Sequence, residues 1–170
     1  MSSPARGLQD APKAEIVRLE ILSREDGRGF LDEFNDLVSR RAYQLFDQDG
    51  RIHGNDLAHW LDAENELATL ADVRESADSL SADVRLPEVS VGGVMVYATE
   101  DRALVYAEPS AVGNSDAHYE GKQAIYYMIR WPEIVDPASC RAELRDRNLT
   151  ITVRKAEIAS RTGTESSEGL

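Results

Sequence analysis

Apolar and polar residues alternate in the stretch YYMIRWPEIVDPASCRAELRDRNLTITVRKAE, residues 126–157. Every second residue is apolar in its final segment, NLTITVRK, and again in CRAELRD just before it. This period of two, with many β-branched residues, is typical of a strand buried on one face. The few residues between the two segments predict a tight turn and therefore an antiparallel pair.

Four more short segments with a similar composition precede CRAELRD and NLTITVRK in the chain. They are rich in Val, Ile, Tyr and Thr, and turn-forming residues separate them. No helical period interrupts the series, so we predict an antiparallel, immunoglobulin-like β-sandwich over residues 76–157. The four segments are SADVRLP (81–87), VMVYATE (94–100), RALVYAE (102–108) and QAIYYMIRWP (123–132).

Residues 15–73 have a helical period instead, because their apolar residues recur at steps of three and four. We predict a helical hairpin over residues 31–72 and hence an α+β fold. Residues 1–14 and the tail 158–170 are rich in small polar residues and are expected to be disordered. The expected core and turn of the hairpin are Tyr43, Leu45, Gly50, Gly54, Leu57, Trp60 and Leu61.

The turn of this hairpin, LFDQDGRIHGNDLAHW (45–60), is acidic in the manner of a calcium loop. If Gly50 takes the sixth position of an EF-hand loop, Asp47 and Asp49 fall at two ligand positions. The first position is then Leu45, which supplies no side-chain oxygen. We therefore interpret the stretch as a turn and expect no calcium site.

Composition limits the classes of partner. The chain of 170 residues is 42% hydrophobic and 29% charged, which is the range of globular domains. Its net charge of −12 argues against nucleic acid and anionic membrane surfaces, which attract basic proteins. The single cysteine, Cys140, excludes an internal disulfide, and no apolar leader or membrane-spanning run is visible. The expectation is a cytoplasmic protein.

No residue pattern predicts catalysis. The histidines His53, His59 and His118 lack metal-ligand spacing, and Cys140 is expected to be a small buried residue at a strand start. The glycines within residues 91–94 join strand segments instead of opening a helix, as a phosphate-binding loop would. We expect no enzyme activity, no cofactor and no metal.

The β half resembles the alpha-crystallin domain of the small heat-shock proteins, on residues 81–108 and 126–157. The resemblance implies a molecular chaperone that binds partly unfolded proteins without ATP. Three departures bear on assembly: Arg147 replaces a usual glycine, the connection 108–122 is short, and Ile158-Ala159-Ser160 is only half of an Ile-x-Ile motif. We expect a homodimer or small homo-oligomer. The matching residues include Pro132, Val135, Asp136, Pro137, Ala142, Leu149, Ile151 and Val153.

In alpha-crystallin domains, a groove at the sheet edge accepts extended hydrophobic segments. The resemblance places its two strands at residues 93–99 and 139–145 of this chain. The alternative, that the lining side chains fill the sandwich core, stays open at this point. The expected lining residues are Val94, Val96, Ala142 and Leu144.

The hairpin segment RAYQLFDQDGRIHGNDLAHWLDAENEL (41–67) resembles a short bacterial helical domain of unknown function, which implies no activity. Two functional hypotheses follow for the whole chain. The first is an ATP-independent chaperone for partly unfolded clients. The second is a co-chaperone-like adaptor that binds a dedicated partner through the hairpin and the sandwich edge.

Overall fold

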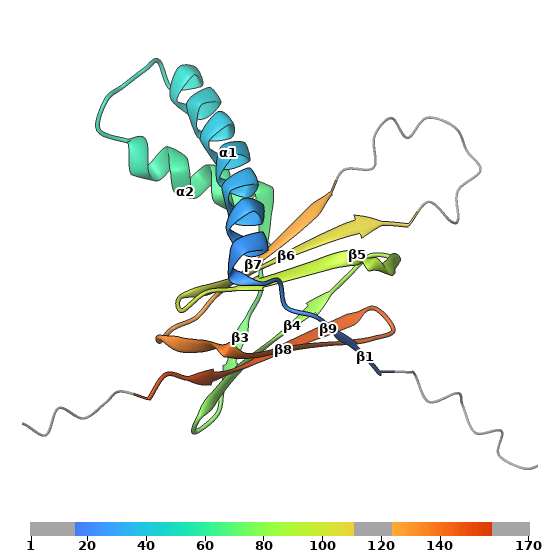
Figure 1. The fold of residues 1–170 in the computed structure, drawn as a ribbon. Coiled ribbons are helices and arrows are strands. Elements are labelled where there is room, and N and C mark those ends of the chain that lie inside the picture. Colours follow the sequence, from blue (N-terminus) through green and yellow to red (C-terminus); the bar gives the residue numbers. More distant parts are fainter. Residues whose placement is uncertain (1–15, 111–123, 158–170) are drawn as a thin grey trace, which may run out of the picture.

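The computed structural model describes residues 16–110 and 124–157, and every structural statement below concerns these parts of the chain. Two β-sheets stack face to face, and two helices lie on the outer side of one of them (Figure 1). The predicted α+β class, with a helical hairpin and a β-sandwich, is confirmed.

The first sheet, sheet A, has five strands, and all neighbouring pairs run antiparallel. The second, sheet B, has four strands and one parallel pair, between β2 and β7 at its edge. In spatial order, sheet A consists of β1 (Ile16–Leu19), β8 (Val135–Arg145), β9 (Asn148–Lys155), β4 (Ser79–Arg85) and β3 (Val73–Glu75). Sheet B consists of β2 (Ala68–Leu70), β7 (Ile125–Arg130), β6 (Arg102–Pro109) and β5 (Val89–Ala98).

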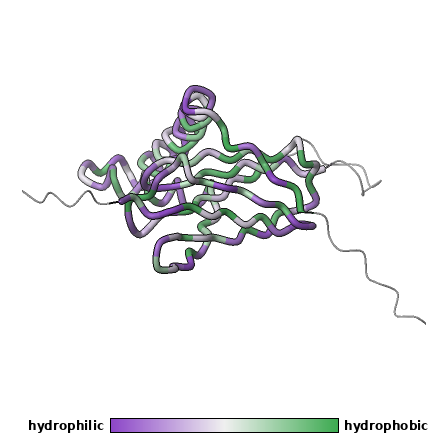
Figure 2. Tube along the Cα trace, turned by 60° about the horizontal axis from the view of Figure 1, so that its bottom comes forward, coloured by the Kyte–Doolittle hydropathy of each residue, from purple (hydrophilic) through white to green (hydrophobic). Residues whose placement is uncertain are grey.

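The main core fills the space between the two sheets. In β9, Leu149, Ile151 and Val153 are buried there, while the alternate residues Thr152 and Arg154 are exposed. The alternation read from the sequence therefore sets which face of the strand is apolar. Figure 2 shows the same alternation of hydrophobic and hydrophilic residues along the strands.

The two helices are α1 (Arg24–Gln48) and α2 (Asp56–Leu67). Helix α1 begins after Ser23, whose hydroxyl oxygen accepts a hydrogen bond from the backbone N–H of Asp26, an N-cap that satisfies a free helical donor. A second core lies between the helices and the outer face of sheet B. Its buried members are Phe30, Phe34, Val38, Ala63, Ala68, Tyr97, Leu104 and Met128.

The expectation that residues 15–73 are helical is wrong at both ends. Residues 16–19 form strand β1 on the edge of β8, and residues 68–70 form β2 on the edge of β7. Strand β3 at residues 73–75 extends sheet A beyond the start predicted at residue 76. These strands are three or four residues long, too short for their period to be read, and each forms because a sheet edge offers unpaired backbone groups.

The connection between the helices is a turn with three left-handed residues. Gly50 and Gly54 have φ of +78° and +107°, and Arg51 has φ of 60°. The two carboxylates of the calcium-like pattern have protein partners: Asp47, at the end of α1, accepts from Arg51 at 2.7 Å, and Asp49 lies 3.3 Å from His59. Within the described residues, His, Cys, Asp and Glu form no group of three or more arranged to hold a metal.

Among the residues that the structure describes, no helix combines the length and the apolar character needed to cross a bilayer. The connection at residues 108–122 is described only to residue 110, so its expected role in assembly lies outside the described residues. The same is true of Ile158-Ala159-Ser160 and of the two termini that were expected to be disordered.

Candidate functional site

The candidate site is the side of the sandwich where β5 of sheet B faces β8 of sheet A, which we call the seam. Residues 16–22, which we call the strap, run along it before the chain enters α1 (Figure 1). Among the described residues, β8 would be an edge strand without this segment, and β5 is the edge strand of sheet B, which the strap meets at the isolated bridge between Ile21 and Val96. An edge strand presents unpaired N–H and C=O groups to any extended chain.

The strap is attached to both sheets through its backbone. Its first part, β1, pairs antiparallel with β8, where Val17 lies opposite Leu144 and Leu19 opposite Ala142. Its second part reaches β5: the N–H of Leu22 donates to the carbonyl oxygen of Val96 at 2.8 Å. An extended segment thus closes the seam by hydrogen bonding to two sheets.

The side chains of the strap divide between core and solvent. Leu19 and Ile21 are partly buried and contact the core between the sheets. Arg18 points away from it, and its Nε lies 3.5 Å from a carboxylate oxygen of Glu143. The strap therefore binds as an apolar–polar–apolar segment, with its apolar side chains seated between the two sheets.

The structure places the four expected groove residues in the core between the sheets. Val94, Val96, Ala142 and Leu144 are all buried, so they do not line an open groove. Three of them lie opposite residues of the strap, which covers the seam at that point. Of the two alternatives left open by the sequence, the structure favours the core, and the strap, whose structure the sequence did not decide, lies beside three of these residues.

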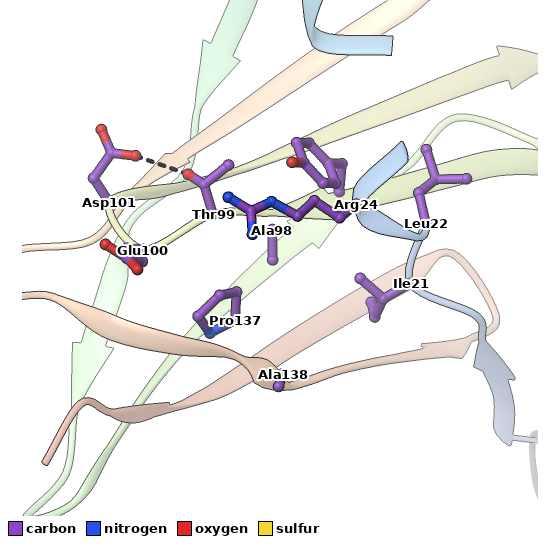
Figure 3. Close-up of a pocket in the computed structure, with 10 residues that line it drawn as sticks. Ile21, Leu22, Arg24, Ala98, Thr99, Glu100, Asp101, Pro137 and Ala138 are labelled. Atoms are coloured by element: carbon purple, nitrogen blue, oxygen red, sulfur yellow. Dashed lines mark hydrogen bonds between the residues drawn. The ribbon is translucent and has the colours of Figure 1, made fainter. Parts of the chain in front are cut away.

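An open cleft begins where the strap leaves the seam (Figure 3). It has a volume of about 610 Å³ and lies between the start of α1, the turn from β5 to β6, and the start of β8. Arg24 extends across it toward that turn, where the Thr99 hydroxyl donates to Asp101 at 2.7 Å. Ile21, Ala98, Pro137 and Ala138 give it apolar walls, so it combines apolar surface with a charged rim.

The hairpin is fastened to sheet B by a buried carboxylate. Glu64 of α2 is only 5% exposed, and its oxygens lie 2.5 Å from Nη2 of Arg130 and 3.6 Å from Nη1 of Arg102. The two arginines are direct cross-strand neighbours in β6 and β7, an arrangement of like charges that is unfavourable alone. Trp60 donates its indole N–H to Glu64 at 3.2 Å. The carboxylate therefore offsets part of the charge of an arginine pair that belongs to the other layer, and Asp101, 3.0 Å from Nη2 of Arg102, offsets the rest.

A glycine lets α1 approach sheet B closely. A Cβ atom on Gly27 would lie 2.0 Å from the ring of Tyr97 in β5, so no other residue fits unless the helix or the ring moves. Two residues further on, a Cβ on Gly29 would meet nothing within 4 Å. Gly27 thus marks the point where α1 sits directly on the strand that also binds the strap.

The prediction of the residues that form the core of the hairpin is partly wrong. Tyr43, Leu57 and Leu61 are 62%, 71% and 39% exposed, whereas Leu45 and Trp60 pack against the second core. The buried side of α1 faces Tyr106 and Tyr126 of sheet B at Phe30 and Phe34 and faces α2 further along, so side chains away from these two contacts stay in solvent. The hairpin therefore packs both on the sandwich and within itself.

Sequence reasoning missed Gly27, Arg102 and Arg130. A glycine inside a long helix is costly and signals a close approach, so Gly27 carried a usable signal. The arginine pair had none, because its register depends on strand pairing between distant segments. Cys140 is buried as expected, and this burial raises the pKa of its thiol to about 11, which makes it a poor nucleophile.

Comparison with known proteins gives one family match. A family described as a protein of unknown function (DUF2934) matches residues 33–69, which include most of α1 and all of α2. This agrees with the resemblance of the hairpin segment to a helical domain of unknown function. No curated protein sequence matches this chain.

Several solved structures of small heat-shock proteins are similar to this chain in fold. Heat shock protein 16.0 from Schizosaccharomyces pombe has 22% identity and a TM-score of 0.44, over 61% of this chain and 76% of that chain. HSP18.5 from E. histolytica has 8% identity and a TM-score of 0.44, over 56% and 94%. The Del-C4 mutant of hsp14.1 from Sulfolobus solfatataricus P2 has 20% identity and a TM-score of 0.43, over 51% and 74%.

Proposed function

We propose that this protein is an ATP-independent chaperone of the holdase type that binds extended segments of partly unfolded proteins at the seam. The observation that carries the proposal is the strap itself. Residues 16–22 lie in the seam as an extended segment, hydrogen-bonded to β8 and β5, with Leu19 and Ile21 against the core. A surface that holds one extended apolar segment by backbone pairing is suited to others of the same pattern.

Backbone pairing explains why such a site would accept many clients. The N–H and C=O groups of an edge strand are the same for every sequence, and only the apolar side chains impose a loose preference. The cleft beside Ile21 offers room for the continuation of a bound chain along β5 and β8. The proposal requires no nucleotide, cofactor or metal, and it places the protein in the cytoplasm as a homodimer or small homo-oligomer.

The test is suppression of aggregation. The full-length protein at an equimolar ratio to a heat-labile test protein, without nucleotide, is expected to slow the rise of light scattering on heating. A photoreactive amino acid at Ala138, in the cleft, should crosslink to the unfolding test protein. The same group at Thr152, exposed on the outer face of sheet A, serves as the matched control. Unchanged scattering, or equal crosslinking from both positions, contradicts the proposal.

A second function, that of an adaptor for one dedicated partner, is favoured by a different observation. Tyr43, Leu57 and Leu61 expose large apolar side chains on the hairpin, where a partner protein would bury them. A strict monomer by light scattering, with one stoichiometric partner recovered after heat stress, supports the adaptor. A concentration-dependent oligomer with many denatured clients supports the chaperone.

A further inference from the structure

We propose that docking of the helical hairpin on sheet B holds the strap in the seam, so that the hairpin acts as a gate for client binding. The inference rests on the proposed function, because it assigns a regulator to the same seam. It gives the hairpin, whose matching family has no known function, a role within this chain.

The first argument is continuity of the chain. Leu22 is hydrogen-bonded to β5, Ser23 is the N-cap of α1, and the helix begins at Arg24. No flexible linker separates the end of the strap from the helix. A movement of the first turns of α1 away from sheet B therefore pulls directly on the hydrogen bond between Leu22 and Val96.

The second argument is that strap and helix share neighbouring residues of β5. Val96 accepts the hydrogen bond of the strap, and Tyr97, the next residue, contacts α1 at Gly27. Successive side chains of a strand point to opposite faces. One strand thus carries the strap on its edge and the helix on its outer face, within two residues.

The third argument is that the strap is weak by itself. Its strand has four residues, Ile16 at its start is 45% exposed, and it is paired along one side only. Short edge pairings with few buried side chains open readily compared with the rest of a fold. The hairpin is held far more firmly, by the second core and by Glu64 between two arginines. The firm element therefore determines the position of the weak one.

Opening of this gate has a defined consequence for binding. With the strap in place, an incoming segment must displace it, so the apparent affinity falls in proportion to the fraction of molecules with an open seam. Undocking the start of α1 raises that fraction. The segment expected to compete best with the strap for the seam is one with the same apolar–polar–apolar pattern as the strap.

The experiment compares Gly27→Ala with Gly29→Ala in the full chain. The first places a methyl group against the Tyr97 ring, and the second adds the same group to the same helix in open space. The probe is a fluorescent peptide with the sequence of residues 15–23, EIVRLEILS, and its control carries serine in place of Leu19 and Ile21. Hydrogen exchange at residues 142–145 reports on the β8 edge beneath the strap.

Gly27→Ala is expected to raise exchange at residues 142–145 and affinity for the peptide, each by about tenfold or more. Gly29→Ala and the wild type should behave alike, and the serine peptide should not bind. If exchange rises along α1 of Gly27→Ala while the β8 edge and peptide affinity stay at wild-type values, the gate is refuted.

A second variant covers the case in which Gly27→Ala does not fold. Replacing Leu19 and Ile21 by serine in the full chain releases the strap without touching the hairpin, and this variant should bind the wild-type peptide. Failure of the peptide to bind this variant overturns the inference.

The aggregation assay separates the two proposals. If the peptide binds but no variant suppresses aggregation, only the proposed chaperone function is refuted. Equal suppression by all variants, with no change in peptide binding, refutes only the gate.

Discussion

The two outer faces of the sandwich are built from the same alternating pattern but differ in chemistry. The outer face of sheet A carries Thr152, Arg154 and Asp83, which lie in solvent. The outer face of sheet B carries aromatic and aliphatic side chains, among them Tyr97, Leu104, Tyr106, Tyr126 and Met128, and the helices cover it. A sheet with one polar face is complete, whereas a sheet that is apolar on both faces needs another layer.

This difference shows that the hairpin belongs to the fold. Phe30 stacks on Tyr126 with ring centroids 6.2 Å apart, and Phe34 lies tilted against the same ring at 5.0 Å. Phe30 also forms a T-shaped pair with Tyr106 at 6.3 Å. Aromatic side chains of this size dominate the energetics of a core. The family that matches residues 33–69 therefore supplies, in this chain, the third layer of an α/β/β stack.

The charges on the two faces differ in the same way. On sheet A, Arg74 pairs with Asp83, which also accepts from Thr150 at 2.7 Å, and these groups are largely in water. On sheet B, Glu64 is buried between α2 and the arginine pair. Exposed ion pairs contribute little because water and salt screen them, whereas a buried carboxylate depends on its partners.

The largest expected effect comes from opening a cavity at the outer face of sheet B, which the helices cover and which we call the covered face. Phe34→Ala removes a fully buried ring between α1 and sheet B and should cost about 3–5 kcal/mol in the free energy of unfolding. The matched change on the bare face, Thr152→Ala, should cost less than about 1 kcal/mol. Urea denaturation followed by circular dichroism measures both. Equal, small losses would mean that the hairpin does not unfold together with the sandwich.

The next test exchanges a carboxylate for an amide on each face. Glu64→Gln removes the charge between the two arginines and should lower the free energy of unfolding by about 1–3 kcal/mol. Asp83→Asn, an isosteric change among exposed charges, should lower it by at most about 0.5 kcal/mol. Repeating both at high salt should abolish the smaller effect and leave most of the larger one. If high salt also abolished the loss of unfolding free energy caused by Glu64→Gln, the interaction of Glu64 with Arg102 and Arg130 would not be a buried one.

The smallest expected effect is a response to alkaline pH on the covered face. Burial, followed by the nearby Tyr106 and Glu33, raises the pKa of the Tyr126 hydroxyl above its ordinary value of 10.0. A tyrosine with a raised pKa in the folded state stabilises the fold fully below pH 10 and loses this contribution as pH rises through the folded pKa. The urea midpoint should therefore fall as pH rises above 10.0, and Tyr126→Phe should reduce that fall.

Tyr127 serves as the internal comparison for this titration. It points into the core between the sheets, its hydroxyl donates to the carbonyl oxygen of Arg85 at 3.3 Å, and burial raises its pKa as well. Tyr127→Phe should reduce the alkaline fall without changing hydrogen exchange in α1. An identical exchange pattern for both variants would show that the two faces of sheet B are not distinguishable by pH.

Much of the fold could be predicted from particular residues. The alternation in β9 predicted its buried face, and the repeat of apolar residues from Leu31 to Leu45 predicted α1, because both periods are local properties of the chain. The strap could not be predicted, since residues 16–19 are a strand only in the presence of β8. The exposure of Tyr43 and Leu57 was missed for a related reason: which side of each helix is buried depends on how the helices pack on each other and on sheet B.

The sequence alone thus determined strands β4 to β9, the two helices and the turn at Gly50 and Gly54. Side-chain direction follows from a residue's own position in a strand or helix, and positive φ follows from the residue type. Only the tertiary structure decided that residues 16–22 close the seam, that Gly27 meets Tyr97 and that Glu64 joins Arg102 and Arg130. Those contacts join segments far apart in the chain, and their geometry exists only after the sheets have formed.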